Sequence, residues 1–346
     1  MRSPKELLRA TKPFAQEVRW HSWWHLLTTI LALAIPLAIC RLDWPWYARL
    51  PFSILAGLVT VRLFIIFHDH QHGAILQKSY LVNGLMTVFG LLTLNPSSVW
   101  KGTHDHHHRN NSKDLCPNIG SFPVMTVEQY RTASFWDRLG YRVARHPLTL
   151  VFGYITVFLG SMTVLAFFKN PRRHYDAVFA VISHVSAIWL LFASWDDRIL
   201  GAILPFAIAS GMGAYLFYAQ HNFPGVKLHT KGDWDYVSAA LRSSSFCDMS
   251  PVMHWFTGNI GYHHVHHLNA KIPYYRLPEA MAALPELQSP TVTSLAPRDV
   301  LACLRLKLWD PVAEEMVPWP KRRAEQPAVL ESLVESVEIP HRRAAG

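Results

Sequence analysis

The chain is poor in charge and in cysteine for its 346 residues. Charged residues make up 16% of the sequence, well below the share in ordinary soluble domains. The four cysteines are scattered and form no Cys-x-x-Cys pair, which excludes a disulfide framework and a zinc ribbon. The first twenty residues are polar and basic, so we expect no secretory signal peptide there.

Long apolar runs take the place of the missing charge, since half of the residues are hydrophobic. The runs cover residues 26–42, 50–67, 81–96, 148–168, 177–195 and 199–219. A membrane-spanning helix needs about 20 mostly apolar residues, and most of these runs approach that length. Their number and length exclude a soluble helical protein and predict a polytopic membrane protein.

The net charge of +9 comes largely from basic residues that flank the apolar runs. Arg2, Lys5, Arg9, Lys12 and Arg19 precede the first run. This placement is typical of cytoplasmic flanks and of contact with anionic lipid head groups. We therefore expect the membrane, and no nucleic acid, as the partner of these charges.

Eleven of the 20 histidines lie in three five-residue windows, at 68–72, 104–108 and 263–267. Residues three and four apart share one face of a helix, so each window can direct a set of imidazoles at one place. These sets are His68 and His72; His104, His107 and His108; and His263, His266 and His267. Histidine is the commonest metal ligand among side chains, and eight imidazoles are too many for one four-coordinate zinc. The windows predict a two-metal centre, for which the ligand type alone leaves iron, copper and zinc open. Two irons that activate O₂ beside a lipid-like substrate fit both the ligand count and the membrane.

The three windows can meet only if an even number of crossings separates them. Residues 81–96 contain Asn83, Gly84 and Pro96, which favour a re-entrant or interfacial segment over a span. The basic loop 169–173 favours the cytoplasm, so 148–168 is predicted to lie at the interface and 177–195 to pair with 199–219 as a hairpin. The prediction is an all-α membrane protein with four spanning helices, a cytoplasmic histidine-rich cap and both termini in the cytoplasm. Residues 1–22 are predicted to form an amphipathic interfacial helix. Residues 1–310 are predicted to form the membrane domain, and 311–346 a polar, partly disordered tail.

These motifs resemble those of the integral-membrane fatty acid desaturases over roughly residues 20–310. The three windows match that family's three histidine boxes in order. The resemblance is closest to the acyl-lipid omega-6, delta-12-like branch, on the stretches Phe217-Tyr-Ala-Gln-His221, Phe256-Thr-Gly-Asn-Ile-Gly-Tyr-His-His-Val-His-His-Leu-Asn269 and Ile272-Pro-Tyr-Tyr-Arg-Leu-Pro278. It implies that His221 is a ninth metal ligand. It also implies that two irons and O₂ serve to place a cis double bond in a fatty acyl chain, with a membrane lipid as the expected substrate.

Other residues in the boxes are expected to do different work. His70, His106 and His264 stand out of step with their ligand neighbours and are predicted to face away from the metals. Asp69 and Asp105 are candidates to accept the second N–H of ligand histidines; the alternative is that they cap helices or pair with Lys101 and Arg109.

The chain has no haem, flavin or nicotinamide motif, so the electrons must come from a partner such as ferredoxin or a b-type cytochrome. Two other functions stay open. A lipid hydroxylase or ketolase could use the same boxes, with the substrate's pose deciding the outcome. A metal transporter or sensor is less well supported, since the windows flank the apolar runs and no polar pathway lies within them.

Overall fold

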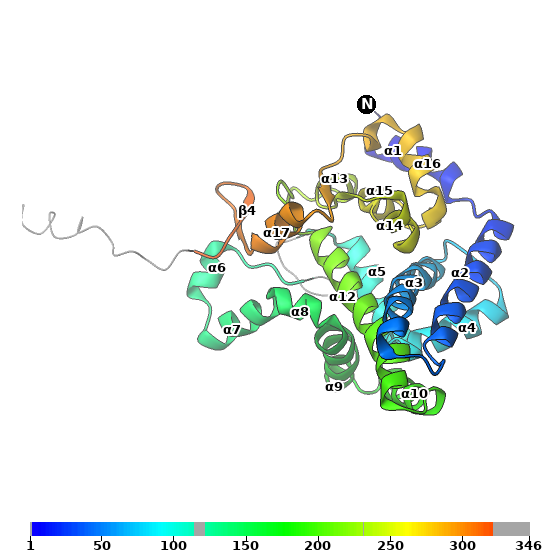
Figure 1. Cartoon of the computed structure of the whole chain (residues 1–346). Helices are drawn as coiled ribbons and strands as arrows, with labels where there is room; N and C mark the ends of the chain where they lie inside the picture. Colours follow the sequence, from blue (N-terminus) through cyan, green and yellow to red (C-terminus); the bar gives the residue numbers. More distant parts are fainter. Residues whose placement is uncertain (1, 114–121, 231, 321–346) are drawn as a thin grey trace, which may run out of the picture.

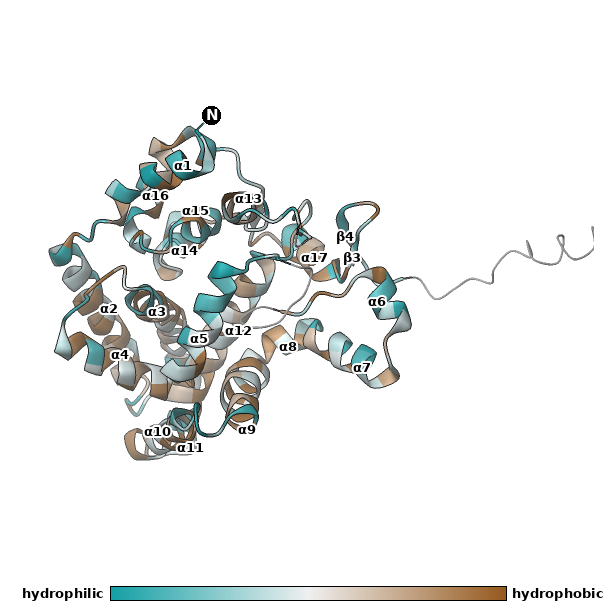
Figure 2. Ribbon diagram, turned by 180° about the vertical axis from the view of Figure 1, so that it is seen from behind, coloured by the Kyte–Doolittle hydropathy of each residue, from teal (hydrophilic) through white to brown (hydrophobic). Residues whose placement is uncertain are grey.

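The computed structural model describes residues 2–113, 122–230 and 232–320, and these are mostly helical. Long apolar helices form one half of the molecule, and a cap of short helices covers one of their ends (Figure 1). Figure 2 shows apolar colouring over helices of the first half and polar colouring on α1 and on the part of α5 that carries box two. The all-α prediction is confirmed, apart from four short strands.

Within the described residues, three helices are long and apolar enough to cross a membrane. They are α2 (Arg19–Ile39), α3 (Trp46–His72) and the continuous helical stretch from α11 (Trp195–Arg198) through η3 (Ile199–Ile203) to α12 (Leu204–Ala219). The 27 residues of α3 extend about 40 Å, against a hydrocarbon core of about 30 Å. Helix α3 therefore carries box one on its own last turns, past the apolar layer.

Three shorter apolar helices complete this half. They are α4 (Tyr80–Leu92), the stretch of η2 (Tyr154–Leu165) and α9 (Ala166–Lys169), and α10 (Asp176–Leu191). The four-span prediction is not fully confirmed, because α10, the predicted third span, has 16 residues and extends only about 24 Å. It ends at Leu191 because the next residue, Phe192, has an extended backbone.

Two contacts nevertheless show where the segment that contains α10 lies relative to α5 and α3. At its start, Asp176 accepts hydrogen bonds from the backbone N–H and hydroxyl of Ser98 on α5, at 3.0 and 2.5 Å. Beyond its end, Asp197 pairs with Arg49, near the start of α3, at 2.7 Å. The chain from α10 to α11 thus connects the start of α5 with the start of α3, and α10 is the candidate for the fourth span.

The surface of this half is apolar. On α2, Leu27, Leu31 and Ile35 are each more than half exposed. On α10, Leu190 is 83% exposed. Soluble monomers rarely leave such continuous apolar faces in water, whereas lipid chains cover them at no cost. The protein is an integral membrane protein.

The cap is built from elements that follow α12, together with α5 (Ser97–Arg109). These elements are α13 (Tyr236–Arg242), α14 (Pro251–Phe256), α15 (His263–Leu268), η4 (Tyr274–Arg276), α16 (Leu277–Ala283), η5 (Pro285–Leu287) and α17 (Pro297–Arg305). A side arm before η2 holds α6 (Val127–Thr132), α7 (Phe135–Ala144) and α8 (Pro147–Val151). Strand β1 (Phe246–Asp248) pairs in parallel with β2 (Val292–Ser294).

The N-terminal prediction is wrong in extent. Residues 1–22 do not form one helix: α1 (Pro4–Ala10) and η1 (Lys12–Ala15) precede α2. Ser3 and Glu6 form a capping box that starts α1, and Pro13 disfavours helix at the residue before it. Leu7 is buried in the same hydrophobic core as residues of α15 and α16, so this segment packs on the cap.

Two short strands lie on either side of the predicted domain boundary at residue 310, which stays a prediction. Strand β3 (Leu308–Asp310) pairs antiparallel with β4 (Glu315–Val317), so the folded part continues past residue 310. The predicted polar tail beyond it stays a prediction, because residues 321–346 lie outside the described residues.

Candidate metal centre

Four separate elements bring the nine predicted ligands together. Box one occupies the last turns of α3, which ends at Gly73 with a φ of 70°, a left-handed conformation that glycine adopts freely. Box two lies on α5, box three makes up most of α15, and His221 follows the end of α12. The helical spacing read from the sequence is therefore realised in each box.

The nine histidines form two adjoining groups, in each of which the candidate ligand nitrogens lie within 4.8 Å of one another. The first group is His68, His72, His104, His108 and His266, and the second is His107, His221, His263 and His267. The rings of His108 and His267 stack across the boundary, with centroids 4.2 Å apart. No sequence rule gave this division, since both boxes two and three contribute to both groups.

The nitrogens within each group converge at distances that suit a shared ion. In the first group, the Nε2 atoms of His104 and His68 are 3.0 Å apart, and those of His266 and His108 are 3.1 Å apart. In the second group, Nε2 of His221 lies 3.0 Å from that of His107 and 2.9 Å from that of His263. Metal–nitrogen bonds of about 2.1 Å place neighbouring ligand nitrogens about 3.0 to 3.4 Å apart. The residues present therefore fit two metal ions.

Several of these nitrogens are buried and have no hydrogen-bond partner among the described residues. They include Nε2 of His72 and both ring nitrogens of His267. A buried polar atom without a partner costs about 1–3 kcal/mol, and such atoms are rare in folded proteins. A bound metal would satisfy those that face the centre of a group.

The environment keeps these imidazoles neutral. Burial lowers the pKa of the box-two and box-three histidines of both groups well below the usual value, and nearby histidines lower it further. Burial also lowers the pKa of His221 to about 4. The neutral ring is the form that binds metals.

The two candidate carboxylates differ in position. Asp69 is buried and accepts the Nδ1–H of His68 at 3.0 Å and the backbone N–H of Tyr274 at 2.7 Å. Asp105 is 32% exposed, lies 3.7 Å from Lys101 Nζ, and is 4.0 Å from Nδ1 of His72, beyond a hydrogen bond. Of the two, Asp69 has the geometry that orients a ligand histidine, and Asp105 pairs with a lysine as the alternative prediction had it.

The three out-of-step histidines lie outside both groups. His70 contacts the carbonyl of Ile75 at 3.1 Å and the side chain of Asn83 at 3.0 Å. His264 contacts the carbonyl of Leu287 at 3.0 Å, and His106 is exposed. The structure places all three away from the convergent nitrogens, as the spacing predicted.

Sequence reasoning missed the part played by Tyr274 and Arg62. Tyr274 holds Asp69 through its backbone N–H, and its hydroxyl accepts a hydrogen bond from the guanidinium of Arg62 at 3.3 Å. The stretch Ile272–Pro278, which contains Tyr274, was noted in the sequence for its resemblance to the family branch. No structural role had been predicted for it.

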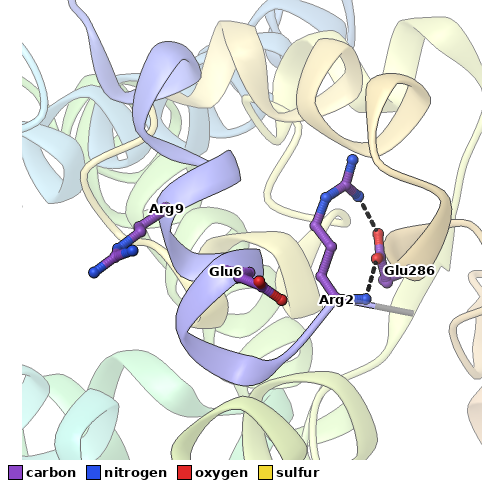
Figure 3. A pocket seen from close by; sticks show the side chains of 4 residues that line it. All are labelled: Arg2, Glu6, Arg9 and Glu286. Carbon is purple, nitrogen blue, oxygen red and sulfur yellow. Dashed lines mark hydrogen bonds and ion pairs between the residues drawn. The ribbon is translucent and has the colours of Figure 1, made fainter.

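A shallow depression elsewhere on the cap is lined by Arg2, Glu6, Arg9 and Glu286 (Figure 3). Arg2 binds Glu286 there through its guanidinium at 2.7 Å and its backbone N–H at 3.1 Å. None of the nine histidines lines it, so it takes no part in the metal centre.

Comparison with known proteins places this geometry in context. The family model described as "Fatty acid desaturase" matches residues 44–295, which include all nine histidines. A protein of Bacillus subtilis named "Fatty acid desaturase" is 33% identical over 316 residues, covering 88% of each chain. Proteins named "sn-1 oleoyl-lipid 12-desaturase" are 26% identical in Synechocystis, over 78% of this chain and 77% of the relative, and 24% identical in Picosynechococcus, over 76% of each.

Proposed function

We propose a metal-dependent function from the premise that this chain belongs to the fatty acid desaturase family and is an enzyme of that type. In this proposal, its two histidine groups hold two iron ions that serve an O₂-dependent desaturation. The observation that carries the proposal is the convergence of nine buried or half-buried imidazoles into two groups at the end of apolar helices. Their ligands in the proposal are His68, His72, His104, His107, His108, His221, His263, His266 and His267, with Asp69 orienting His68.

The reaction converts a CH₂–CH₂ unit of an acyl chain into a cis CH=CH unit. The substrate gives up two hydrogens, an external donor gives two electrons, and two protons are taken up, so that one O₂ becomes two waters. The bound irons would supply the oxidising power that no side chain can provide. The protein's own residues hold the metals, orient His68 and keep the surroundings of the site largely buried.

For the substrate we propose the acyl chain of a membrane lipid that already has one double bond, with the new bond at a delta-12-like position. The support comes from the motifs between Phe256 and Pro278 and from the relatives in Synechocystis and Picosynechococcus, which are named as oleoyl-lipid 12-desaturases. The histidine groups lie at the end of apolar helices, which suits a substrate that is itself part of the membrane.

Expression in a host without polyunsaturated lipids, followed by lipid mass spectrometry, tests this function. We expect a lipid two hydrogens lighter than its monounsaturated precursor, and no such product from a His266→Ala variant. A product with one added oxygen would establish the hydroxylase alternative. A new bond at carbon nine of a saturated chain would keep the chemistry and refute the branch assignment.

The electron donor and the orientation complete the proposal. The donor is a separate protein such as a ferredoxin or a b-type cytochrome. The histidine boxes and both termini face the cytoplasm. This orientation is supported by the basic loop after α9, because Arg173 Nη2 lies 3.2 Å from where a β-carbon of residue 102 on α5 would stand.

A further inference from the structure

On one side of the molecule, α5 is the helix that lies between the two histidine groups and the surface. Its inner face carries His104, His107 and His108, all buried. Lys101, with a side chain 55% exposed, lies at the edge of that face, and the opposite face carries the exposed residues His106 and Arg109. His106 and Arg109 therefore lie on the surface of the described chain.

Cations from two other segments gather on the same surface. The guanidinium of Arg173 lies against Gly102 of α5, with Nη2 3.2 Å from where a β-carbon would stand. The exposed Lys271, which follows box three, donates from Nζ to the carbonyl of His72 at 2.5 Å. We call Lys101, Arg109, Arg173 and Lys271 the α5 patch. Asp105 lies beside them, 3.7 Å from Lys101 Nζ.

The α5 patch touches the backbone that holds a candidate ligand. Lys101 Nζ donates to the carbonyl of Gln71 at 3.0 Å, and Lys271 Nζ donates to the next carbonyl, that of His72. Both ammonium groups therefore sit on the end of α3, one on the carbonyl of His72 itself and one on that of the residue before it. A molecule that pairs with these lysines therefore lies beside the end of α3 that carries His72.

We propose that the α5 patch is the docking surface for an acidic one-electron carrier protein, an inference that rests on the function proposed above. That reaction consumes two electrons from outside, and the sequence has no motif for a bound flavin, haem or nicotinamide. An excess of exposed positive charge over the metal centre steers an acidic partner and fixes its orientation. Anionic lipid is the other ligand that such charges could attract, and the experiment separates the two.

The test measures binding of an acidic ferredoxin to the full-length protein in nanodiscs of zwitterionic lipid. The variant is Lys101→Glu/Lys271→Glu, and its control is Lys5→Glu/Arg298→Glu, which makes the same charge change at exposed sites outside the patch. We expect the patch variant to weaken binding about tenfold or more at low salt, and the control far less. The difference should shrink as salt rises above about 0.15 M, where the Debye length is about 8 Å.

The neutral variant Lys101→Gln/Lys271→Gln and the iron content of each protein guard against a folding artefact. We expect the neutral variant to lose part of the affinity and to keep its iron. Equal losses in the patch and control variants would overturn the proposal. So would unchanged ferredoxin binding together with weaker association with vesicles of anionic lipid. Patch variants that desaturate at the wild-type rate with limiting ferredoxin would refute the docking surface and leave the enzyme function intact. Patch-dependent ferredoxin binding by a protein that makes no desaturated lipid would support the surface and refute the function.

Discussion

The carboxylate of Asp69 offers the sharpest test of how the chain orients its ligands. The side chain is 1% exposed and accepts two hydrogen bonds, one from Nδ1–H of His68 and one from the backbone N–H of Tyr274. Both carboxylate oxygens are thus engaged. In an Asp69→Asn variant, only one of the two positions keeps an acceptor, because the other becomes an NH₂ group.

The magnitude follows from that change. If the amide oxygen keeps the N–H of Tyr274, the NH₂ group faces Nδ1–H of His68, and two donors oppose each other. His68 then relieves the conflict by moving its proton from Nδ1 to Nε2, the nitrogen that lies 3.0 Å from Nε2 of His104. Once protonated, Nε2 of His68 can no longer bind a metal. Loss of such a partner typically lowers metal affinity or activity about 10- to 100-fold, or about 1.4–2.7 kcal/mol. We expect a loss of that size.

The assay compares iron per chain, desaturation rate and melting temperature for Asp69→Asn and Asp105→Asn. The second variant is the matched control, because Asp105 is partly exposed and too far from His72 for a hydrogen bond. We expect it to change activity by less than about fivefold, as for a surface ion pair. Full iron and full activity in Asp69→Asn would refute the reasoning, as would an equal loss in Asp105→Asn.

Three further predictions concern ligands, pH and topology. His70→Ala and His106→Ala should keep measurable desaturation, whereas His221→Ala should abolish it; an inactive His106→Ala enzyme with a normal melting temperature would contradict the assignment of ligands. Burial and nearby Arg145 lower the pKa of Lys307 from 10.5 to about 8. Between pH 8 and 10.5 the unfolded chain therefore binds more protons than the folded protein, so the free energy of unfolding should rise with pH. The melting temperature of wild type should therefore rise relative to Lys307→Met from pH 8 to 10, and a constant difference would refute this. Topology can be tested with an impermeant thiol reagent on single-cysteine reporters in a Cys116→Ser background. The reagent should label Asp43→Cys in intact cells, but should label Val312→Cys, at a site 94% exposed, only after permeabilisation. The reverse pattern would overturn the cytoplasmic cap.

Much of the site could be read from the sequence because helical spacing is a local property. The intervals between His104, His107 and His108 fix a shared face, and the offset of His106 turns it away, whatever surrounds the helix. Local spacing could not divide the nine histidines into groups, because that depends on how α3, α5 and α15 meet. It also could not separate Asp69 from Asp105: both follow a ligand histidine, and only the distant Tyr274 fixes Asp69.

The fold followed the same rule. Apolar runs located the long helices, and α3 extends through box one as its pattern indicated. The length of an apolar run did not predict the length of α10. The run 177–195 has 19 residues, but an extended backbone at Phe192 ends the helix after 16 residues. At the N-terminus, basic residues beside Leu7 and Leu8 suggested contact with the membrane surface, but the core of the cap buries Leu7 instead.

The central claim is that the two histidine groups hold two irons, and metal analysis of the purified protein tests it most directly. Wild type should hold about two irons per chain, by the ligand numbers that such centres use. His72→Ala, in the first group, and His263→Ala, in the second, should each lose iron, while His70→Ala should keep it. One zinc per chain and no iron, or full iron in both ligand variants, would contradict the account.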